Sequence, residues 1–368
     1  MSDRDDPLRL ATRGSDLARR QAATVQSRLT DRRLAVELVE VETTGDAVRD
    51  ELIHELGTTG AFVRSLDERV LTGELDGAVH SMKDMPTEQP DDLVIAGVPD
   101  RGPAADVLVT PDGQSLADLP EGATVGTSSL RRQAQLRAAR PDLHVAGLRG
   151  NVDTRVEKLL APSLQREHER RLTTEEEDGA ETAGSDGMDD RTAQEWFDDL
   201  AEIERQALGR EVDTEYDAIC LAEAGLERSG LLEQLAYERL EPTEFVPAPA
   251  QGAIAVTALD GETTERIRSI LDHPPTRVTT TVERTVLAEL GGGCVAPVGV
   301  YARLRGEVVD TVVRVLDRAG ETEVAGSREL PVERHAEAAA AFAADLAEEG
   351  AATLVEQARR ENPDGAKR

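Results

Sequence analysis

Residues 8–41 read LRLATRGSDLARRQAATVQSRLTDRRLAVELVEV, a segment that begins and ends in short apolar runs typical of β-strands. Between these runs, residues 8–12 and 35–41, Ser15 can cap a helix. The apolar side chains of that helix recur on one face, at Leu17, Ala18, Ala22, Val25 and Leu29. A strand, a helix and a second strand joined by short turns form the repeating unit of α/β proteins. The segment therefore predicts an α/β fold.

The same alternation continues along the first two thirds of the chain. Strands are expected in DGAVHSM, DLVIAGV, DVLVT, GATVGTSS, LHVAGL and YDAICLA, and helices over residues 130–139 and around Phe62, Val63, Leu66 and Val70. This order favours α/β domains with largely parallel sheets. After Pro274 and Pro275 the pattern changes to a helix through Val282, Val286 and Leu290, then alternating strands over residues 298–330, then alanine-rich helices. That order predicts a small α+β domain at the C-terminal end.

Two segments rich in proline, glycine and alanine are typical of crossovers between domains, PDRGPAA (residues 99–105) and PAPAQG (residues 247–252). A chain that leaves one domain and later returns to it crosses at two such points. We therefore expect a discontinuous first domain of residues 1–99 and 253–272, a second domain of residues 105–246, and a third of residues 275–368.

Residues 161–213 fit neither pattern, and about 50 residues are far more than an ordinary connection needs. The first half contains TTEEEDGAETAGSDG, which is acidic and low in complexity and is expected to be disordered. The second half places Trp196, Leu200, Ile203 and Ala207 on one face of a helix. We expect a surface insertion in the second domain, with one docked helix and no catalytic role.

The charge of the chain is strongly negative, with 73 acidic and 42 basic residues and a net charge of −31. Such a surface disfavours nucleic acid and anionic membranes as partners, and suits a salt-rich cytoplasm. The acidic N-terminus MSDRDDP, two cysteines and the lack of a bilayer-length apolar run also favour a cytoplasmic protein. An acidic ligand would need a locally basic pocket in this acidic shell.

Several chemistries lack the sequence patterns that they need. The six histidines show no pair at metal-ligand spacing, and HExxH and CxxC do not occur in the sequence. There is no GxxxxGK phosphate loop, no GxGxxG after a strand, and no GxSxG elbow. The sequence therefore supports neither a metal site, nor a nucleotide site, nor a serine hydrolase.

The two cysteines differ in their surroundings. Cys294 lies in LGGGCVAPVG, where three glycines and a proline predict a tight, exposed turn. A thiol presented in this way can act as a nucleophile or as a covalent anchor, although a free cysteine is often inert. Cys220 lies in the apolar run YDAICLA and is more simply a small core residue.

HSMKDMP, residues 80–86, ends an expected strand in a polar cluster. The ends of strands in parallel sheets are where ligands bind. Asp84 in this cluster could accept hydrogen bonds from an N–H donor and stabilise a developing cation. It could equally be a turn carboxylate that caps backbone N–H groups.

GTSSLRRQAQLR, residues 126–137, has the form of an anion site. Ser129 lies at a helix N-terminus, where backbone N–H groups favour negative charge, and Arg131 and Arg132 follow directly. LRGNVDTR then adds Arg149 and Arg155. Each arginine alone is more simply a solvated surface residue. As a group they suit a ligand with several carboxylates, because arginine pairs with carboxylates bidentately.

Eight segments in order resemble the porphobilinogen deaminase (hydroxymethylbilane synthase) family: LRLATRGSDLA, GAFVRSLDERVL, DGAVHSMKDMP, VGTSSLRRQAQLR, LRGNVDTRVEKL, YDAICLAEAGLER, PAPAQGAIAV and ERTVLAELGGGCVAPVG. The resemblance implies two α/β domains like those of type II periplasmic binding proteins, plus a small C-terminal α+β domain. It also implies a monomeric transferase that condenses four molecules of porphobilinogen head to tail. Ammonia is released at each step, and the product is the linear tetrapyrrole hydroxymethylbilane.

The resemblance further implies a role for individual residues. A dipyrromethane cofactor would be bound to Cys294 by a thioether. Asp84 would hold pyrrole N–H groups and stabilise the cation formed when porphobilinogen loses ammonia, with Lys83 beside it. The acetate and propionate groups would be bound by Arg13, Ser15, Ser129, Arg131, Arg132, Arg149, Arg155 and Arg228.

The chain departs from the family pattern in four places. Thr58-Thr59-Gly60-Ala61-Phe62 stands where Gly-Lys-Gly-Leu-Phe is common, which puts a loop-borne lysine contact in doubt. Ala296 replaces a β-branched residue, and Gly291 stands where glutamate is frequent. The insertion at residues 161–213 is not typical of the family.

Two other functions remain open at this point. One is a non-enzymatic anion-binding protein with the same two-domain clamp, which would leave Cys294 without a purpose. The other is a thiol hydrolase with Cys294 as nucleophile, for which no histidine can be assigned as the base.

Overall fold

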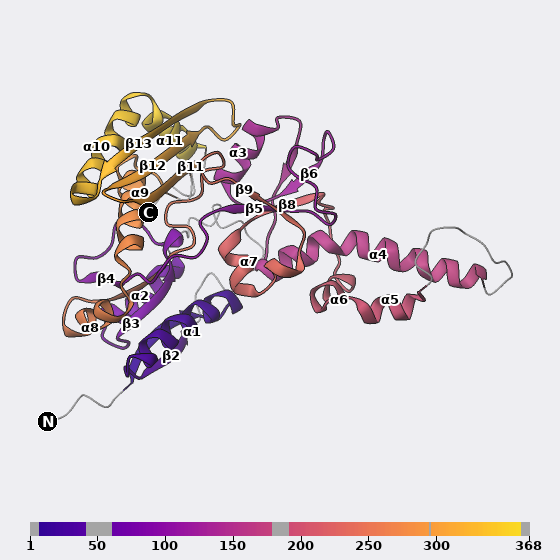
Figure 1. Ribbon diagram of the computed structural model, residues 1–368, viewed down its shortest axis with the longest axis horizontal. Coiled ribbons are helices and arrows are strands. Elements are labelled where there is room, and N and C mark those ends of the chain that lie inside the picture. Colours follow the sequence, from indigo (N-terminus) through magenta and orange to yellow (C-terminus); the bar gives the residue numbers. More distant parts are fainter. Residues whose placement is uncertain (1–6, 42–60, 179–190, 294–295, 362–368) are drawn as a thin grey trace.

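The computed structural model of the chain describes residues 7–41, 61–178, 191–293 and 296–361. Its strands form three sheets, two of five strands and one of three (Figure 1). The predictions at Cys294 and at residues 58–60 lie outside the described residues. None of the described helices combines the length and the apolar character that a membrane crossing requires.

The first sheet has the strand order β2-β1-β3-β10-β4. Its strands are β1 (Leu8–Arg13), β2 (Val36–Val41), β3 (Gly77–Ser81), β4 (Leu93–Gly97) and β10 (Ile254–Leu259). The accompanying helices are α1 (Asp16–Asp31), α2 (Ala61–Leu71) and α8 (Glu262–Leu271). Ser15 caps α1 by accepting a hydrogen bond from the N–H of Ala18, as predicted.

The second sheet has the strand order β7-β6-β8-β5-β9. Its strands are β5 (Asp106–Val109), β6 (Thr124–Gly126), β7 (His144–Ala146), β8 (Ala218–Ala222) and β9 (Tyr237–Leu240). The helices of this part are α3 (Leu130–Ala139), α4 (Val152–Asp178), α7 (Glu223–Ser229) and the 3-10 turn η2 (Leu232–Gln234). The bounds of α3 are those that the sequence predicts.

The prediction of largely parallel sheets holds for four of the five strands of each sheet, and the fifth strand makes both sheets mixed. In the first sheet β10 runs antiparallel to β3 and β4, and in the second β5 runs antiparallel to β8 and β9. The remaining pairs are parallel. β5 and β10 are the strands that follow the two crossovers. At each crossover the chain leaves one five-stranded sheet and enters the other, and the strand that it then forms runs antiparallel to its neighbours.

The two crossovers lie side by side. The N–H of Gly102 donates to the carbonyl of Gly252 at 3.1 Å. Gly252 has a φ of 85°, and a Cβ there would lie 2.5 Å from the carbonyl oxygen of Pro103. Only glycine allows so close an approach of two backbones. The domain boundaries proposed from the sequence at these crossovers stay a prediction.

The C-terminal part is built on an antiparallel sheet with the order β11-β12-β13. It contains α9 (Pro274–Glu289), β11 (Val298–Arg305), β12 (Val308–Leu316), β13 (Glu323–Pro331), η3 (Val332–Arg334), α10 (His335–Glu348) and α11 (Ala351–Arg360). Val282 and Val286 of α9 and its C-cap residue Leu290 are buried in the core of this part, as their spacing predicts.

The insertion is more ordered than predicted. Helix α4 continues to Asp178, so Thr173–Asp178 is helical where we expected disorder, and residues 179–190 lie outside the described part. The second half forms two short helices instead of one, α5 (Ala193–Asp199) and α6 (Glu202–Leu208). The packing of Trp196 explains why these helices are ordered. Its ring stacks on that of His168, with the ring centroids 6.0 Å apart, and the Arg171 guanidinium carbon lies 5.5 Å from the centroid of the Trp196 ring. Figure 1 shows these helices projecting away from the sheets.

Candidate functional site

The first component of the site is the turn that follows β3. Its core is the 3-10 helix η1 (Met82–Asp84). Met82 and Met85 are buried, and the N–H of Met82 donates to the carbonyl of Ala253 at 3.0 Å. The two methionines thus hold the turn on the first sheet. Between them, Lys83 is half-buried and Asp84 is exposed to solvent.

The second component is the N-terminus of α3. Ser129 is its N-cap residue, and the Ser129 hydroxyl accepts a hydrogen bond from the N–H of Arg132 at 3.5 Å. Arg131 and Arg132 form the first turn of the helix, and both side chains are buried. A buried guanidinium requires hydrogen-bond partners, and here the first partner comes from the protein itself.

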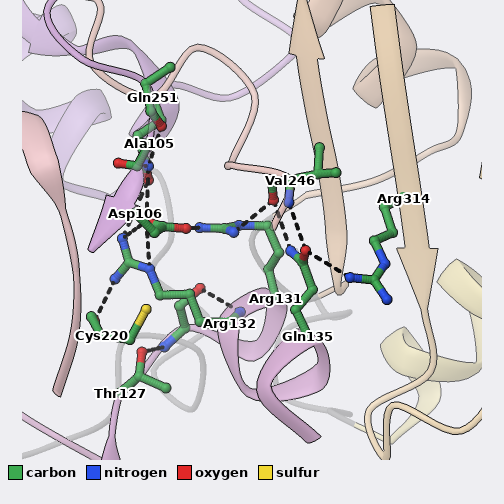
Figure 2. A network of polar contacts seen from close by, with 12 residues as sticks. Ala105, Asp106, Thr127, Arg131, Arg132, Gln135, Cys220, Val246, Gln251 and Arg314 are labelled. Atoms are coloured by element: carbon green, nitrogen blue, oxygen red, sulfur yellow. Dashed lines mark hydrogen bonds and ion pairs between the residues drawn. The ribbon is translucent and has the colours of Figure 1, made fainter. Parts of the chain in front are cut away.

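That partner is Asp106, which is fully buried at the start of β5 (Figure 2). Its two carboxylate oxygens are shared between the arginines, with Arg131 Nη2 2.7 Å from Oδ2 and Arg132 Nη2 2.7 Å from Oδ1. The side-chain amide of Gln251, on the second crossover, donates to Oδ1 at 2.9 Å. Arg131 also donates to the carbonyl of Val246 at 2.8 Å. One carboxylate therefore organises both guanidiniums and ties them to the crossover.

The pKa values around this network are shifted by burial and by the neighbouring charges. Burial alone would raise the pKa of Asp106, but the positive charges of Arg131 and Arg132 lower it to about 2. Burial lowers the pKa of Lys83, and Arg132 lowers it further. Burial and the charge of Arg132 also lower the pKa of Arg155 to about 10. Cations held so close together favour a ligand with several negative charges.

The Asp84 turn and the arginine helix lie within electrostatic reach of each other. Burial would lower the pKa of Arg132, but Asp106 and, less strongly, Asp84 raise it. Asp84 likewise opposes the burial that lowers the pKa of Lys83. The two motifs are more than 40 residues apart in sequence, yet the fold brings the charges of Lys83 and Asp84 close enough to act on Arg131 and Arg132.

The Asp106 network predicts a pH-dependent contribution to stability. The folded pKa of Asp106 lies below its ordinary value of 3.8, so the network stabilises the fold above about pH 4 and loses this effect as the pH falls towards 2. This corresponds to about 2 kcal/mol. Asp106→Asn should lower the free energy of unfolding by at least this amount at neutral pH and flatten its acid dependence, as measured by denaturant titration at several pH values.

Asp142 provides the matched control for this prediction. Its pKa is also lowered to about 2, by a hydrogen bond from Arg140, but its side chain is 30% exposed. Solvent screens such a pair, so Asp142→Asn should have a much smaller effect. Equal effects of the two substitutions would contradict a special role for the buried network.

The other predicted site residues are more scattered. Arg149 is half-buried in the loop after β7, and Arg155 lies in the first turns of α4, with its Nε donating to the carbonyl of Gly150 at 2.8 Å. Arg228, on α7, donates to the carbonyl of Gly252 at 2.6 Å and so contacts the second crossover. Burial lowers the pKa of Arg228.

Two further residues lie at the end of β1. Arg13 is the last residue of that strand and is half-buried. The hydroxyl of Ser15 caps α1, as described above. The Ser15 hydroxyl thus serves its own helix, and the Arg228 guanidinium holds the second crossover; in the described part of the chain neither of these hydrogen bonds is made to Asp106 or to its two arginines.

Helix α9 links the C-terminal part to the crossovers. Glu283 is fully buried and accepts from Arg101 at 2.7 and 3.0 Å, from the N–H of Ala250 at 2.6 Å and from the N–H of Ala302 at 2.8 Å. Ala250 has a φ of 59°, unusual for a residue with a Cβ, and the hydrogen bond from its N–H to Glu283 helps to hold it there. A single carboxylate thus joins both crossovers to the helix that precedes Cys294 in sequence.

Of the two cysteines, only Cys220 is described. It is fully buried, as predicted, and burial raises the pKa of its thiol to about 12. Cys220 is therefore unsuited to act as a nucleophile. Two of the glycines before Cys294 are favoured by the backbone and its surroundings. Gly291 has a φ of 64°, which favours glycine, and a Cβ on Gly292 would lie only 2.6 Å from a Leu287 methyl group.

Sequence reasoning missed three buried polar residues of this region, Asp106, Gln251 and Glu283. For Asp106 there was a local signal, because a carboxylate at the head of the apolar run DVLVT needs a buried cationic partner. Neither Gln251 nor Glu283 carries such a signal. Among the residues that the structure describes, no group of three or more histidine, cysteine, aspartate or glutamate side chains could hold a metal ion.

Comparison with known proteins identifies the family of the chain. The model of the "Porphobilinogen deaminase, dipyromethane cofactor binding domain" matches residues 8–166 and 204–266, and that of the C-terminal domain matches residues 278–349. The unmatched gap lies within the projecting insertion. A "Probable porphobilinogen deaminase" of Halobacterium salinarum is 51% identical, over 96% of this chain and 98% of its own.

A more distant sequence relative supports the same family, whereas the similar solved structures resemble this chain only loosely. The "Porphobilinogen deaminase" of Thermobifida fusca is 36% identical, over 96% of this chain and 97% of its own. Among solved structures, the methionine-binding protein MetQ covers 72% of this chain and 89% of its own, with a TM-score of 0.36 and 12% identity, which is too loose to carry an argument. On the family models and the sequence relatives, the chain belongs to the porphobilinogen deaminase family.

Proposed function

We propose that condensation of porphobilinogen takes place where the Asp84 turn meets the N-terminus of α3. The activity of the family is that of a deaminase in tetrapyrrole biosynthesis, and porphobilinogen is its substrate. The observation that carries the proposal is the meeting of one exposed carboxylate, Asp84, with several buried or half-buried cations whose pKa values are lowered. Such a site is suited both to a polyanion and to a developing cation.

The residues present fit a dipyrromethane cofactor, which carries acetate and propionate groups. The Nε of Arg131 is buried and has no hydrogen-bond partner among the described atoms. A buried donor of this kind favours an incoming acceptor. Two guanidiniums share the single Asp106 carboxylate, so the network keeps a net positive charge for ligand carboxylates. The match of residues 8–166 and 204–266 to a cofactor-binding domain agrees with this fit.

Several residues are assigned to carboxylate binding in this proposal. Those nearest the Asp106 network are Lys83, Ser129, Arg131, Arg132 and Arg155. Those further from it are Arg13, Ser15, Arg149 and Arg228. The second group would bind the growing chain, because each added pyrrole brings two more carboxylates and needs further cations.

Asp84 has a different role from the cations. It accepts hydrogen bonds from pyrrole N–H groups and stabilises the positive charge that develops on porphobilinogen as ammonia leaves. The bound cofactor supplies the nucleophilic α-carbon of its terminal pyrrole. Lys83 beside Asp84 orients a ligand carboxylate, so that the charge of Asp84 remains directed at the substrate. Cys294 holds the cofactor and the product chain by a thioether.

The intact mass of the purified, denatured protein tests this proposal. It should exceed the mass of the sequence by two pyrrole units, and brief exposure to porphobilinogen should add further single units. The alternative of a plain anion-binding protein predicts the bare mass, with substrate binding but no added units. Full activity with an unmodified mass would contradict the covalent tether.

The thiol-hydrolase alternative has lost support. His80, four residues before Asp84, is buried and hydrogen-bonds to Asp67 at 2.9 Å and Thr257 at 3.1 Å, so it serves the core. The monomeric state implied by the resemblance and the cytoplasmic location expected from the composition stay predictions.

A further inference from the structure

Arg284 of α9 donates hydrogen bonds to the backbone of the Asp84 turn. Its Nη1 lies 3.4 Å from the carbonyl oxygen of Met82 and 3.2 Å from that of Met85, and its Nη2 lies 2.6 Å from that of Pro86. These three carbonyls flank Asp84 on both sides. Five N–H donors in a rigid planar fork make arginine suited to hold several acceptors in a fixed arrangement.

Holding the Arg284 guanidinium in this position costs desolvation free energy. It is half-buried, and burial lowers its pKa, which shows that the charged form is desolvated. Carbonyl oxygens satisfy its hydrogen bonds but provide no neutralising charge. A neutral side chain could fill the same space with a smaller desolvation penalty. Packing alone therefore does not explain why an arginine donates to these three carbonyls.

The helix that carries Arg284 is itself firmly fixed. The preceding residue, Glu283, is fully buried and joins both crossovers and β11 through the hydrogen bonds described above. The helix ends at Glu289, five residues before Cys294 in the sequence. One helix therefore connects the catalytic turn, the crossovers and the segment that leads to the anchor.

We propose that Arg284 is a positioning residue, which sets the place of the Asp84 carboxylate relative to the rest of the site. The inference rests on the role proposed above for Asp84. Arg284 acts on that carboxylate only through the backbone of residues 82–86. A shift of about 1 Å in a catalytic group can lower the rate about 100-fold, so even a modest loosening of the turn should be measurable.

Arg277 offers a matched control on the same helix. It also joins α9 to the first sheet, with its Nε 2.8 Å from both carboxylate oxygens of Asp272 and its Nη2 3.2 Å from the carbonyl of Ile95. These contacts lie on β4 and the segment before α9, away from the Asp84 turn. Arg277→Gln should therefore weaken the same interface without moving Asp84.

The test compares Arg284→Gln, Arg284→Lys and Arg277→Gln in the full-length protein with its covalent pyrroles. We expect Arg284→Gln to keep the mass increment of the unaltered protein, to lower kcat about tenfold or more, and to leave KM within about twofold, because Asp84 acts mainly in the transition state. Arg284→Lys should recover part of kcat, since its ammonium can still donate to these carbonyls. Arg277→Gln should keep kcat within about twofold at a comparable loss of thermal stability.

Other outcomes would overturn the inference. These are a kcat for Arg284→Gln within twofold of the unaltered protein, a loss that resides wholly in KM, or an equal loss in Arg277→Gln. If Arg284→Gln does not fold, the same comparison of kcat and KM for Arg284→Lys decides. An unaltered protein without extra mass would instead refute the proposed function, so the two failures can be told apart.

Discussion

Cys294→Ser is expected to remove the mass increment of two pyrrole units and to lower tetrapyrrole synthesis about 1000-fold or more. A serine hydroxyl cannot form a thioether and is a far weaker nucleophile than a thiolate. Without a covalent tether, each product chain would have to rebind at every step, and the advantage of an intramolecular reaction would be lost. Intact mass and product formation, measured on the same preparation, check both parts of this expectation.

Cys220→Ala is the matched control for this experiment. Cys220 is fully buried with a pKa of about 12, so its thiol should carry no pyrrole. The contact of Arg132 with residue 220 is made to the backbone carbonyl at 3.2 Å and survives the substitution. Cys220→Ala should therefore keep the mass increment and most of the turnover. Retention of the increment in Cys294→Ser, or its loss in Cys220→Ala, would contradict the assignment of the anchor.

Local sequence patterns predicted most of the individual helices and strands. The bounds of α3 follow from a capping serine at 129 and a proline at 141, and α1 follows from its cap and its buried face at Ala22, Val25 and Leu29. Caps and periodicity act within a few residues, which is why the sequence alone reveals them. The reversed direction of β5 and β10 was not predicted, because it is set by the crossovers, which are a long-range property of the chain.

The insertion shows how packing can override composition. The acidic run after Thr173 suggested disorder, yet α4 extends to Asp178. The helices α5 and α6 pack against α4, and Ala193, Trp196, Ile203 and Ala207 are all buried. Such contacts between segments can stabilise a helix whose own sequence is weakly helical. The amino-acid composition of a segment does not reveal such contacts.

The arginine cluster was predicted as a group, but its internal partner was not. Arg131 and Arg132 were expected to bind ligand carboxylates directly, whereas each of them already pairs with Asp106. This pairing depends on the strand order, because β5 joins β8 in the middle of the second sheet. Preassembly by Asp106 would let the guanidiniums bind a ligand with little rearrangement. The role of the arginines as ligand-binding residues stays a prediction.

The second of the two large effects concerns the carboxylate of the catalytic turn. Asp84→Asn is expected to lower kcat about 100-fold, with KM changed less than about threefold and with the pyrrole mass still present. Asparagine has nearly the same size and keeps one acceptor oxygen for a pyrrole N–H. It carries no charge, so the positive charge that develops as ammonia leaves would lose its nearest counter-charge. Steady-state kinetics on protein of verified mass measure this effect.

Glu88→Gln separates this role from a general effect of negative charge near the turn. Glu88 lies four residues after Asp84 and is likewise exposed. Removing its charge changes the net charge by the same one unit, but in this proposal Glu88 makes no contact with the reacting pyrrole, so its screened charge contributes little there. Its kcat should stay within about twofold of the unaltered protein. Near-normal turnover in Asp84→Asn, or an equal loss in Glu88→Gln, would show that the cation is stabilised elsewhere.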